Sequence, residues 1–434
     1  MFFSVKMNTI IIFVATVFFS CKNNFDLPFY PSYEWPKPVC DTTLKVVWQK
    51  IIAPDSSYGV AQFFSIDGKN IFWIGSDHGN IESNTDSKLG YFEFDGNKIM
   101  ESWTKYKDRS SDSKNLIFDS GRKLVVHEGK LIYTSWHELF CFSDNGDLLW
   151  KNSKFSGKNE QGNGGPFISL YGNKVYFPSD GKEITDESYL FEIDSETGKE
   201  KLLFTEPVKN NLTSHLECPV LYIHNNDTIA TFQSRKWNIK TLVNRADMVA
   251  WNISKNEILW RVDSIDRYAQ SSSNPILFEN NKLYYAGAFD IYCLDAFTGK
   301  LIWRQAFDYL HYRFNRASML LLKNGLVAKS EHEEIALLDK ETGAIIWENR
   351  NVGTGSSQIE LYKGDLIMSS GGKGTIECLD SRTGLIKWKA KAPNQCLDSR
   401  AGFGLYSFVI NPKTNLLYIC DKFFIQCLKL PGYE

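Results

Sequence analysis

Apolar and polar residues alternate in short runs along most of this chain. Such alternation is typical of β-strands that bury one face. The clearest set predicts four consecutive strands: Pro275–Phe278, Leu283–Gly287, Ile291–Leu294 and a last strand that ends at Trp303. Short polar segments such as Glu279–Lys282 separate the runs and have the composition of tight turns. The pattern therefore indicates a small four-stranded antiparallel unit.

The segment before Trp303 has the spacing Asp-x-x-Thr-Gly-x-x-x-Trp, and close copies return at Asp339–Trp347 and Asp380–Trp388. Weaker copies extend the series upstream. The anchor positions are Trp103, Trp150, Leu202 in place of a tryptophan, Trp260, Trp303, Trp347 and Trp388. Successive anchors are 47, 52, 58, 43, 44 and 41 residues apart, which is the size of one four-stranded propeller blade.

Each copy of the motif has a physical role at its two ends. The Asp or Asn side chain accepts hydrogen bonds from the backbone amides that follow, and Gly tolerates a positive φ, so the segment forms a turn. The tryptophan is a broad apolar ring that fills the wedge between neighbouring blades. We therefore interpret the tryptophans as structural anchors.

The two ends of the chain complement each other. Three strand-like runs follow Trp388, namely Leu405–Ile410, Leu416–Cys420 and Phe423–Leu430, without a fourth strand or a tryptophan. Thr43–Trp48 is a fourth strand with its tryptophan and has no blade of its own. We expect this strand to complete the last blade, which closes the ring and leaves no open sheet edge. The predicted fold is all-β: an eight-bladed β-propeller of four-stranded antiparallel blades over residues 43–434, with Trp48 as the eighth anchor.

On these motifs the chain resembles the pyrroloquinoline-quinone-like (PQQ-like) repeat propellers, whose tryptophan-docking motif ends in Asp-x-x-Thr-Gly-Lys-x-x-Trp or a variant of it. The resemblance spans residues 43–430. It implies the fold but no activity, because the family holds quinone-dependent alcohol and sugar dehydrogenases and also catalytically silent scaffolds. One silent scaffold is an eight-bladed lipoprotein of the outer-membrane β-barrel assembly machinery, and the resemblance suggests it as a functional analogue.

Composition argues against a nucleic-acid-binding protein and against a protein with membrane-spanning helices. Aromatic residues make up 14% of the chain, charged residues 23%, and the net charge is −2, which is typical of a large soluble β domain and argues against a nucleic-acid partner. After the N-terminus, no segment approaches the roughly 18 apolar residues of a membrane-spanning helix. The continuous repeat predicts one domain and a monomeric ring.

The N-terminus has the pattern of an export signal. Lys6 precedes the apolar run Ile10–Phe19, and Ser20-Cys21 follows. This resembles a lipoprotein signal peptide of residues 1–20, cleaved before a lipidated Cys21, although Phe18 stands where such signals usually have leucine. An ordinary secretory signal with an incidental cysteine is the alternative. Residues 21–42 contain four prolines and are expected to form an extended, lipid-anchored tether in the cell envelope, on a membrane face that the pattern does not define.

The nine cysteines raise the question of disulfides, because the chain is expected to be exported. Four of them fall at near-equivalent places in the third strand of different blades and should lie too far apart to bridge: Cys141, Cys293, Cys378 and Cys427. We interpret these four as buried free thiols. With Cys21 assigned to the lipid, a disulfide among the remaining four, Cys40, Cys218, Cys396 and Cys420, stays open.

The requirements of quinone chemistry are not met in the sequence. The family's alcohol dehydrogenases use adjacent cysteines and a calcium ion held by acidic and amide groups. This chain has no Cys-Cys pair, and its spacing does not place a calcium cluster. The glycine-rich segment Gly371–Thr375 lacks the spacing of a phosphate loop and is interpreted as a turn between a second and a third strand. We expect no cofactor, no metal ion and no catalytic residues.

One face of the propeller gathers the candidate binding residues. Loops that enter each inner strand and loops that join strands two and three emerge on the same face. The resulting candidate rim consists of His78, Trp136, His137, His332, His311, Arg313, Arg316 and Arg400. Mixtures of Arg, Tyr and Trp are typical of binding surfaces. Solvated turn residues without a function are the alternative.

The segment Ser234–Asp247 is long for a turn inside a blade and is a second candidate contact, as a projecting hairpin, with family drift as the alternative. Two functions remain. The first is a noncatalytic, membrane-tethered scaffold that binds a protein partner in the envelope. The second is a surface or periplasmic module that binds a small ligand or glycan, or a degenerate quinoprotein-like enzyme.

Overall fold

The computed structural model describes residues 44–51, 60–65, 70–76, 87–94, 99–105, 124–134, 139–152, 168–180, 187–208, 212–238, 244–266, 276–314, 318–354, 359–395, 402–403, 408–421 and 424–433. The expected signal peptide, Cys21 and the tether of residues 21–42 lie outside this set. Within it, no helix is long and apolar enough to cross a membrane.

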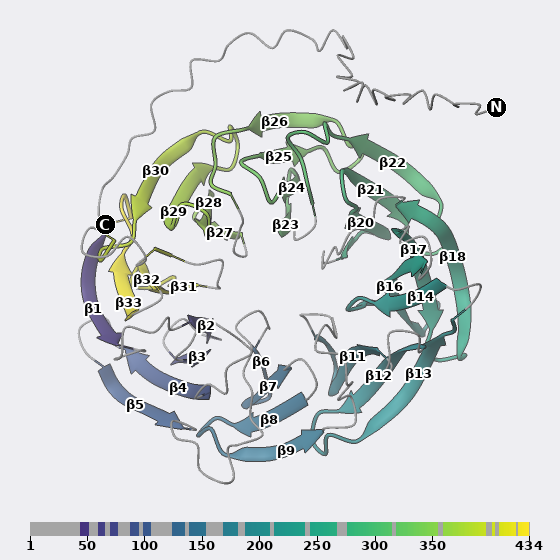
Figure 1. Ribbon diagram of the computed structural model, residues 1–434, viewed down its shortest axis with the longest axis horizontal. Helices are drawn as coiled ribbons and strands as arrows, with labels where there is room; N and C mark the ends of the chain where they lie inside the picture. Colours follow the sequence, from purple (N-terminus) through teal and green to yellow (C-terminus); the bar gives the residue numbers. More distant parts are fainter. Residues whose placement is uncertain are drawn as a thin grey trace, which may run out of the picture. The chain divides into compact units, whose positions relative to one another are not determined.

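The described strands form eight antiparallel sheets, which follow one another around a ring (Figure 1). Sheet A contains β1 (Lys45–Ile51), β31 (Val409–Asn411), β32 (Leu416–Cys420) and β33 (Phe424–Lys429). Sheet B contains β2 (Val60–Ser65), β3 (Asn70–Ser76), β4 (Ser87–Phe94) and β5 (Ile99–Lys105). Sheet C contains β6 (Leu124–His127), β7 (Lys130–Thr134), β8 (Leu139–Ser143) and β9 (Leu148–Asn152). Sheet D contains β10 (Ser169–Tyr171), β11 (Lys174–Asp180), β12 (Ser188–Asp194) and β13 (Glu200–Glu206).

The remaining sheets continue the series. Sheet E contains β14 (Leu212–Leu216), β15 (Val220–His224), β16 (Asp227–Asn238), β17 (Asn244–Asn252) and β18 (Glu257–Asp266). Sheet F contains β19 (Leu277–Glu279), β20 (Lys282–Ala286), β21 (Asp290–Asp295) and β22 (Leu301–Ala306). Sheet G contains β23 (Ser318–Leu322), β24 (Gly325–Lys329), β25 (Ile335–Leu338) and β26 (Ile345–Asn349). Sheet H contains β27 (Glu360–Tyr362), β28 (Asp365–Ser370), β29 (Thr375–Asp380) and β30 (Ile386–Lys391). The predicted all-β propeller of four-stranded antiparallel blades is confirmed.

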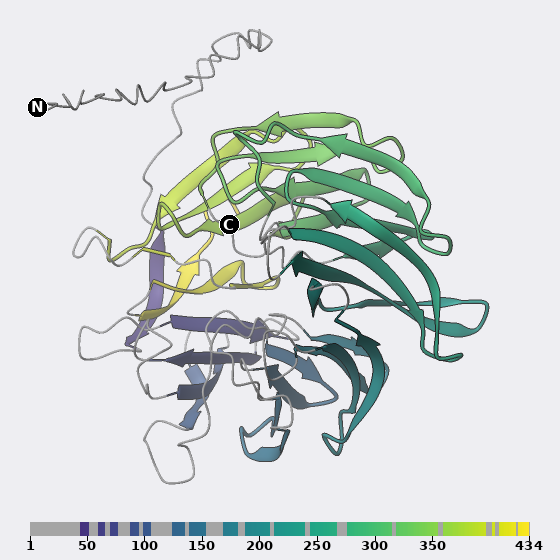
Figure 2. The same cartoon turned by 45° about the vertical axis from the view of Figure 1, so that its right-hand side comes forward.

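The first described strand closes the ring. β1 pairs antiparallel with β33, so that Lys45 lies opposite Lys429 and Ile51 lies opposite Phe424. In both views β1 lies beside β33 although the two strands come from opposite ends of the chain (Figures 1 and 2). The prediction that the N-terminal strand completes the last blade is therefore confirmed. Pairing satisfies the edge of sheet A that β33 would otherwise leave open.

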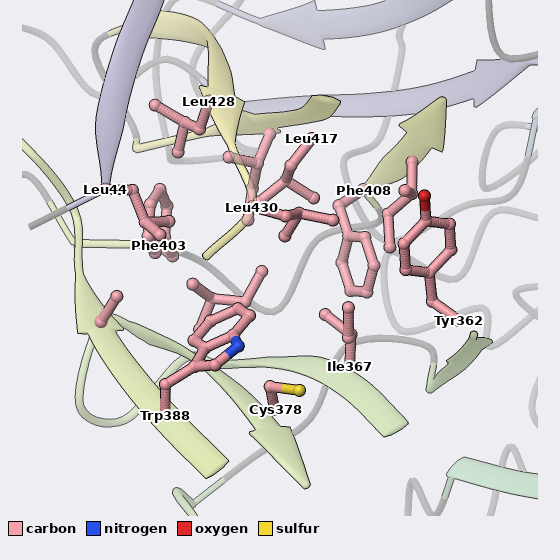
Figure 3. Close-up of a cluster of buried hydrophobic side chains, with 14 of the residues drawn as sticks. Leu44, Tyr362, Ile367, Cys378, Trp388, Phe403, Phe408, Leu417, Leu428 and Leu430 are labelled. Atoms are coloured by element: carbon pink, nitrogen blue, oxygen red, sulfur yellow. The ribbon is translucent and has the colours of Figure 1, made fainter. Parts of the chain in front are cut away.

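Apolar side chains fill each junction between neighbouring sheets. At the junction of sheets H and A, Ile367 and Trp388 pack with Leu417 and Leu428, and Leu44 caps the cluster from the chain that leads into β1 (Figure 3). Seven further clusters join the other neighbouring pairs of sheets around the ring. Because each sheet packs between two others, middle strands such as β24 and β28 are buried along their whole length.

The tryptophan of one sheet docks on the turn of the next. The indole Nε1 of Trp303 donates a hydrogen bond to the carbonyl oxygen of Lys340, at 2.9 Å. The same contact recurs for Trp150 with Ser195, Trp260 with Ala296, and Trp347 with Ser381. In each turn the Asp side chain accepts backbone hydrogen bonds, as Asp295 does from Thr298 at 2.8 Å. These contacts join each tryptophan to the turn of the neighbouring sheet.

The remaining anchors differ in detail. Trp48 meets Phe92 of sheet B edge to face, with ring centroids 4.9 Å apart. Trp388 is 9% exposed within the cluster between sheets H and A. Leu202, which replaces a tryptophan, is half exposed, and the junction of sheets D and E is filled instead by Phe204 against Trp251. The side chain of Trp103 lies outside the described set.

Sheet E departs from the four-stranded plan. β14 and β15 both pair with β16, which has 12 residues and is long enough to hold one strand beside each half. The segment Ser234–Asp247 extends the β16–β17 hairpin, as the sequence predicted for its backbone. Its Arg235 does not project, because it is 8% exposed and pairs with Glu217 at 2.7 Å.

The four equivalent cysteines are buried and free: Cys141, Cys293, Cys378 and Cys427. Burial raises the pKa of Cys141, Cys293 and Cys378 to about 12, so these thiols stay protonated at neutral pH. The prediction of buried free thiols is confirmed. Cys218 and Cys420 form no disulfide with another described cysteine, and Cys40 and Cys396 lie outside the described residues.

Candidate functional site

One face of the propeller collects the loops between blades and the turns between second and third strands. On sheets F, G and H this face, which we call the mouth, contains the mouth loop (residues 307–314) and the mouth turn (residues 330–334). The opposite face, which we call the turn face, carries the Asp-x-x-Thr-Gly turns and the turns between first and second strands. This division follows from the strand directions and agrees with the expected arrangement.

Two buried aromatic rings hold the mouth loop in place. Tyr312 is 1% exposed and Phe314 is fully buried, and both rings pack against Phe307. Between these fixed points Asp308 organises a tight turn, since its carbonyl oxygen accepts a hydrogen bond from the amide of Tyr312 at 2.8 Å. The turn leaves Tyr309 67% exposed. The loop is therefore a fixed platform for exposed side chains.

The mouth loop and the mouth turn bring His311 and His332 together. The ring nitrogen Nδ1 of His332 lies 3.2 Å from the carbonyl oxygen of His311. His311 in turn places its own Nδ1 3.8 Å from the carboxylate of Glu334 and its Nε2 3.8 Å from that of Asp308. The side chain of His311 is 47% exposed, so a partner would reach this imidazole from solvent.

Glu334 is the buried acid of this group. Its side chain is 6% exposed and accepts a hydrogen bond from Ser330 Oγ at 2.9 Å. Burial raises the pKa of Glu334 above its usual range, although the bond from Ser330 and the nearby His332 oppose the shift. Glu334 therefore fixes the mouth turn from within and orients the exposed His311 above it.

Lys329 stabilises the same mouth turn from its buried side. Its side chain is 1% exposed, and Nζ donates hydrogen bonds to the carbonyl oxygens of Ser330 and His332. Burial lowers the pKa of Lys329 to about 8, and the carboxylates of Glu377 and Glu334 limit that shift. Because the amine is bound to backbone oxygens and shielded from solvent, we assign it a structural role.

The mouth turn also contacts sheet H. Glu333 forms an ion pair with Lys373, at 2.6 Å, across the junction of sheets G and H. Beneath it, the fully buried Glu377 accepts a hydrogen bond from the amide of Gly353 at 3.0 Å and pairs with Lys389. The segment that contains Lys373 is the turn between β28 and β29, so its interpretation as a plain turn is confirmed.

Backbone hydrogen bonds connect each interblade loop to the turns beside it. The amide of Phe314 donates to Ala288, and the amide of Glu331 donates to Arg313, both at 2.8 Å. Similar bonds join Val352 to Glu333, Gly372 to Thr354 and Phe403 to Gly374. The mouth is therefore braced from sheet F to the loop that follows sheet H, and side chains mounted on it are held at fixed spacing.

The predicted rim is only partly described. His311, Arg313 and His332 lie within one continuous region, where Arg313 is half-buried and takes part through its carbonyl oxygen. The remaining five lie outside the described residues: His78, Trp136, His137, Arg316 and Arg400. For these five, membership of the rim stays a prediction.

The sequence pattern did not identify several buried polar residues as functional or structural partners. Lys329 ends an apolar strand and Glu377 lies within another, and a single polar residue in an apolar run does not indicate its partners. A further ion network joins sheets D and E, where Lys236 pairs with Glu206 of β13 and with Asp247 of β17, at 2.9 and 2.7 Å. Among the described residues, no three His, Cys, Asp or Glu side chains lie close enough to hold a metal ion.

Comparison with known proteins begins with the repeats. Residues 244–311 and 321–405 match the profile of a family described as the outer membrane protein assembly factor BamB. A protein of Rickettsia prowazekii that has no assigned function is 25% identical over 164 residues, which are 36% of this chain. The match covers 38% of that relative, well under two thirds of its length.

Solved structures extend the likeness to the whole ring. BamB from Moraxella catarrhalis superposes with a TM-score of 0.54 at 12% identity, over 91% of this chain and 99% of that one. Quinohemoprotein alcohol dehydrogenase from Comamonas testosteroni gives a TM-score of 0.60 at 11% identity, over 88% of this chain and 76% of that one. At such identities the likeness concerns the fold alone. The matched repeats and this likeness in fold support the resemblance to the PQQ-like repeat β-propellers that the tryptophan-docking motifs suggested.

Proposed function

We propose that this protein is a noncatalytic scaffold: an eight-bladed propeller lipoprotein of the cell envelope that binds a protein partner at its mouth. The observation that carries the proposal is the braced mouth loop, which presents exposed side chains from a fixed backbone. A preorganised surface loses little conformational entropy when a partner binds. The ring is proposed to act as a monomer.

The chemistry of the mouth supports a protein partner. Tyr309 and Leu310 are 67% and 55% exposed, and His311 lies beside them. A large aromatic ring, an aliphatic side chain and a polar group on a rigid loop are the usual constituents of a protein interface. The proposed contact surface includes these three residues, Arg313 and His332, together with the undescribed part of the rim.

The envelope location rests on two supports. The matched family profile is that of an outer membrane assembly factor, and the N-terminal pattern resembles a lipoprotein signal that ends before Cys21. We propose that lipidated Cys21 anchors the chain through the tether of residues 21–42. The fold fits a scaffold role, and the partner is proposed to be another protein of the envelope.

The test is partner capture from detergent-solubilised membranes. Wild-type protein should retain a defined envelope partner, and Tyr309→Ser combined with Leu310→Ser should lose it. The matched control is Leu202→Ser, because Leu202 is also half exposed but lies on an outer strand. Equal capture by all three proteins would contradict binding at the mouth loop.

A second outcome would favour the alternative function. If no protein is captured but the mouth retains a glycan or a small ligand, the chain is a binding module. Turnover of an alcohol or sugar would indicate a degenerate quinoprotein-like enzyme. Both outcomes would be decided with the same mouth-loop variants.

A further inference from the structure

A short tail follows β33 on the turn face and crosses from sheet A to sheet H. β33 ends at Lys429, and Leu430 continues into the apolar cluster between the two sheets, where it is 1% exposed (Figure 3). Gly432 turns the backbone with a φ of +80°, and Tyr433 then packs its ring against the same cluster. We call residues 430–433 the strap.

The hydroxyl group of Tyr433 reaches two side chains of sheet H. It donates a hydrogen bond to Oδ2 of Asp365 at 2.5 Å and lies 3.6 Å from Sγ of Cys378. Asp365 is 5% exposed and pairs with Lys387 at 2.6 Å, so the acceptor is held in place. Burial raises the pKa of Tyr433 far above its ordinary value, and the bond to Asp365 adds to the shift. The phenol therefore keeps the proton that it donates.

Side chains of both sheets hold the rest of Tyr433. Its ring meets that of Tyr362 edge to face, with centroids 5.1 Å apart, and the ammonium group of Lys363 lies 5.9 Å from its centroid. From sheet A, Nδ2 of Asn415 donates a hydrogen bond to the carbonyl oxygen of Tyr433. Oδ1 of the same Asn415 accepts hydrogen bonds from Tyr362 at 2.5 Å and from Lys363 at 2.7 Å. The strap is therefore part of one connected set of contacts between the two sheets.

These contacts lie at the junction where the ring closes. Leu44, which leads into β1, belongs to the same apolar cluster as Leu430 and Cys378. Pairing of β1 with β33 joins the two ends of the chain inside sheet A. The strap adds a connection of a different kind, because it leaves sheet A and places its side chain on sheet H.

Two equivalent thiols allow this junction to be compared with the rest of the ring. Cys378 lies opposite Trp388 in sheet H, and Cys293 lies opposite Trp303 in sheet F. Both thiols are fully buried. The strap lies beside Cys378, whereas Cys293 is two sheets away from it.

We propose that the strap locks the closed ring: Tyr433 holds sheet A against sheet H, and its release opens this junction while the other sheets stay folded. Four residues hold the strap on the surface, so its release requires far fewer contacts to break than unfolding of a sheet. Local openings of this kind are drawn from the least stable parts of a fold. The proposal concerns the conformation of the ring and is independent of the proposed partner and of the lipid anchor.

The test measures the reactivity of the two equivalent thiols in the full chain, purified in detergent. Timed iodoacetamide treatment at about pH 8, followed by peptide mapping, gives the rate of each cysteine in the same sample. The strap variant is Tyr433→Ala. The matched control is Tyr171→Ala, which removes a tyrosine ring that is 37% exposed on sheet D. Cys293 separates opening at the junction from a general loss of stability.

We expect Cys378 to react on the order of a hundredfold faster in the strap variant than in wild type, because a hydrogen bond to a carboxylate and an aromatic contact are lost together. Cys293 should change by less than about twofold, and the control should leave both rates unchanged. Amide hydrogens of β1 and β33 should exchange about tenfold faster in the strap variant, while those of β21 and β22 should not.

A milder variant keeps the test decisive if Tyr433→Ala does not fold. Tyr433→Phe retains the ring contacts and loses only the hydrogen bond to Asp365. Cys378 should then react about tenfold faster than in wild type, again with no change at Cys293.

Three results would overturn the proposal. Equal acceleration of Cys378 and Cys293 would make Tyr433 a general stabilising residue. Faster reaction of Cys378 with unchanged hydrogen exchange in β1 would show that the strap covers the thiol without holding the junction. Wild-type rates in both Tyr433 variants would show that the strap has no part in closure.

Discussion

The indole ring of Trp303 lies against Gly343 of the next sheet so closely that a Cβ atom on the glycine would come within 2.5 Å of the ring. The backbone of Gly343 also has a φ of +75°, a conformation that other residues adopt at a cost. The same relation holds for Trp150 with Gly198, Trp260 with Gly299 and Trp347 with Gly384. One glycine thus serves both the turn and the interblade contact.

The first prediction separates the cost of the positive φ from the cost of the clash with the indole ring. Gly343→Ala should lower the free energy of unfolding by roughly 3 to 5 kcal/mol, because it adds a clash with Trp303 to the backbone strain. Gly364→Ala should cost only about 1 to 2 kcal/mol. Gly364 has a φ of +88° but no atom within 4 Å of the added Cβ. Urea denaturation measures the free energy of unfolding of both variants. Equal losses of stability would show that the contact with the ring contributes nothing.

The second prediction separates fold from binding. Replacement of Trp303, Trp347 or Trp388 by Ala should cost roughly 3 to 5 kcal/mol, as for other large core aromatics. His332→Ala and Arg313→Ala should each change stability by less than about 1 kcal/mol while weakening partner capture. Thermal melts compare the two sets. Tryptophan variants that melt like wild type would refute the anchor role.

The third prediction concerns thiol reactivity. Cys141, Cys293 and Cys378 should resist alkylation of the folded protein at pH 8, because they are buried and their pKa values are raised to about 12. Cys218 is only half-buried and should react faster. Peptide mapping after timed iodoacetamide treatment distinguishes them. Labelling of Cys293 as fast as Cys218 would contradict this account.

The fourth prediction is a pH dependence. Burial raises the pKa of Glu360 from 4.5 to about 7, so the folded state disfavours the ionised form. The resulting penalty is absent below pH 4.5 and complete above pH 7, so stability falls as pH rises through this window. Glu360→Gln should therefore be about 1 to 3 kcal/mol more stable than wild type at pH 8 and equal to it at pH 4. Glu257→Gln, at an exposed position, serves as the control. If both variants showed the same dependence of stability on pH, burial of Glu360 would not be the cause.

The fifth prediction tests the anchor. Cys21→Ser should move the protein from the membrane fraction to the soluble fraction, because a lipidated cysteine is the proposed attachment. Fractionation at high salt is the appropriate measurement, since salt weakens electrostatic attachment to lipid headgroups. A variant that stays in the membrane fraction at high salt would indicate another anchor.

Local patterns were sufficient for the blade and its closure. The Asp295–Trp303 motif contains both kinds of residue that form the docking contact. Each copy supplies a tryptophan to one neighbouring sheet and a turn to the other. The missing last strand after Trp388 and the spare strand before Trp48 predicted the β1–β33 pairing for the same reason. These contacts are repeated, so one sequence shows them several times.

The mouth was harder to predict because its contacts occur once and cross between blades. His311 and His332 are 21 residues apart and meet only through a backbone oxygen, which no residue pattern reveals. Lys329 ends an apolar strand, and its bonds to the mouth turn depend on the turn's conformation. In sheet E, the Ser234–Asp247 segment was correctly expected to form a hairpin, but burial of Arg235 depends on Glu217, which lies in the connection between β14 and β15.

Closure by β1 also has a consequence for biogenesis. The partner of Lys45–Ile51 is β33, which the ribosome makes long after β1, so β1 has no partner strand until β33 has been synthesised. During that interval the incomplete ring exposes backbone donors and acceptors that other strands would pair with. A chain of this design stays open at β1 until residue 429 is available, and truncation before Phe424, which removes β33, would reopen the ring at its first strand.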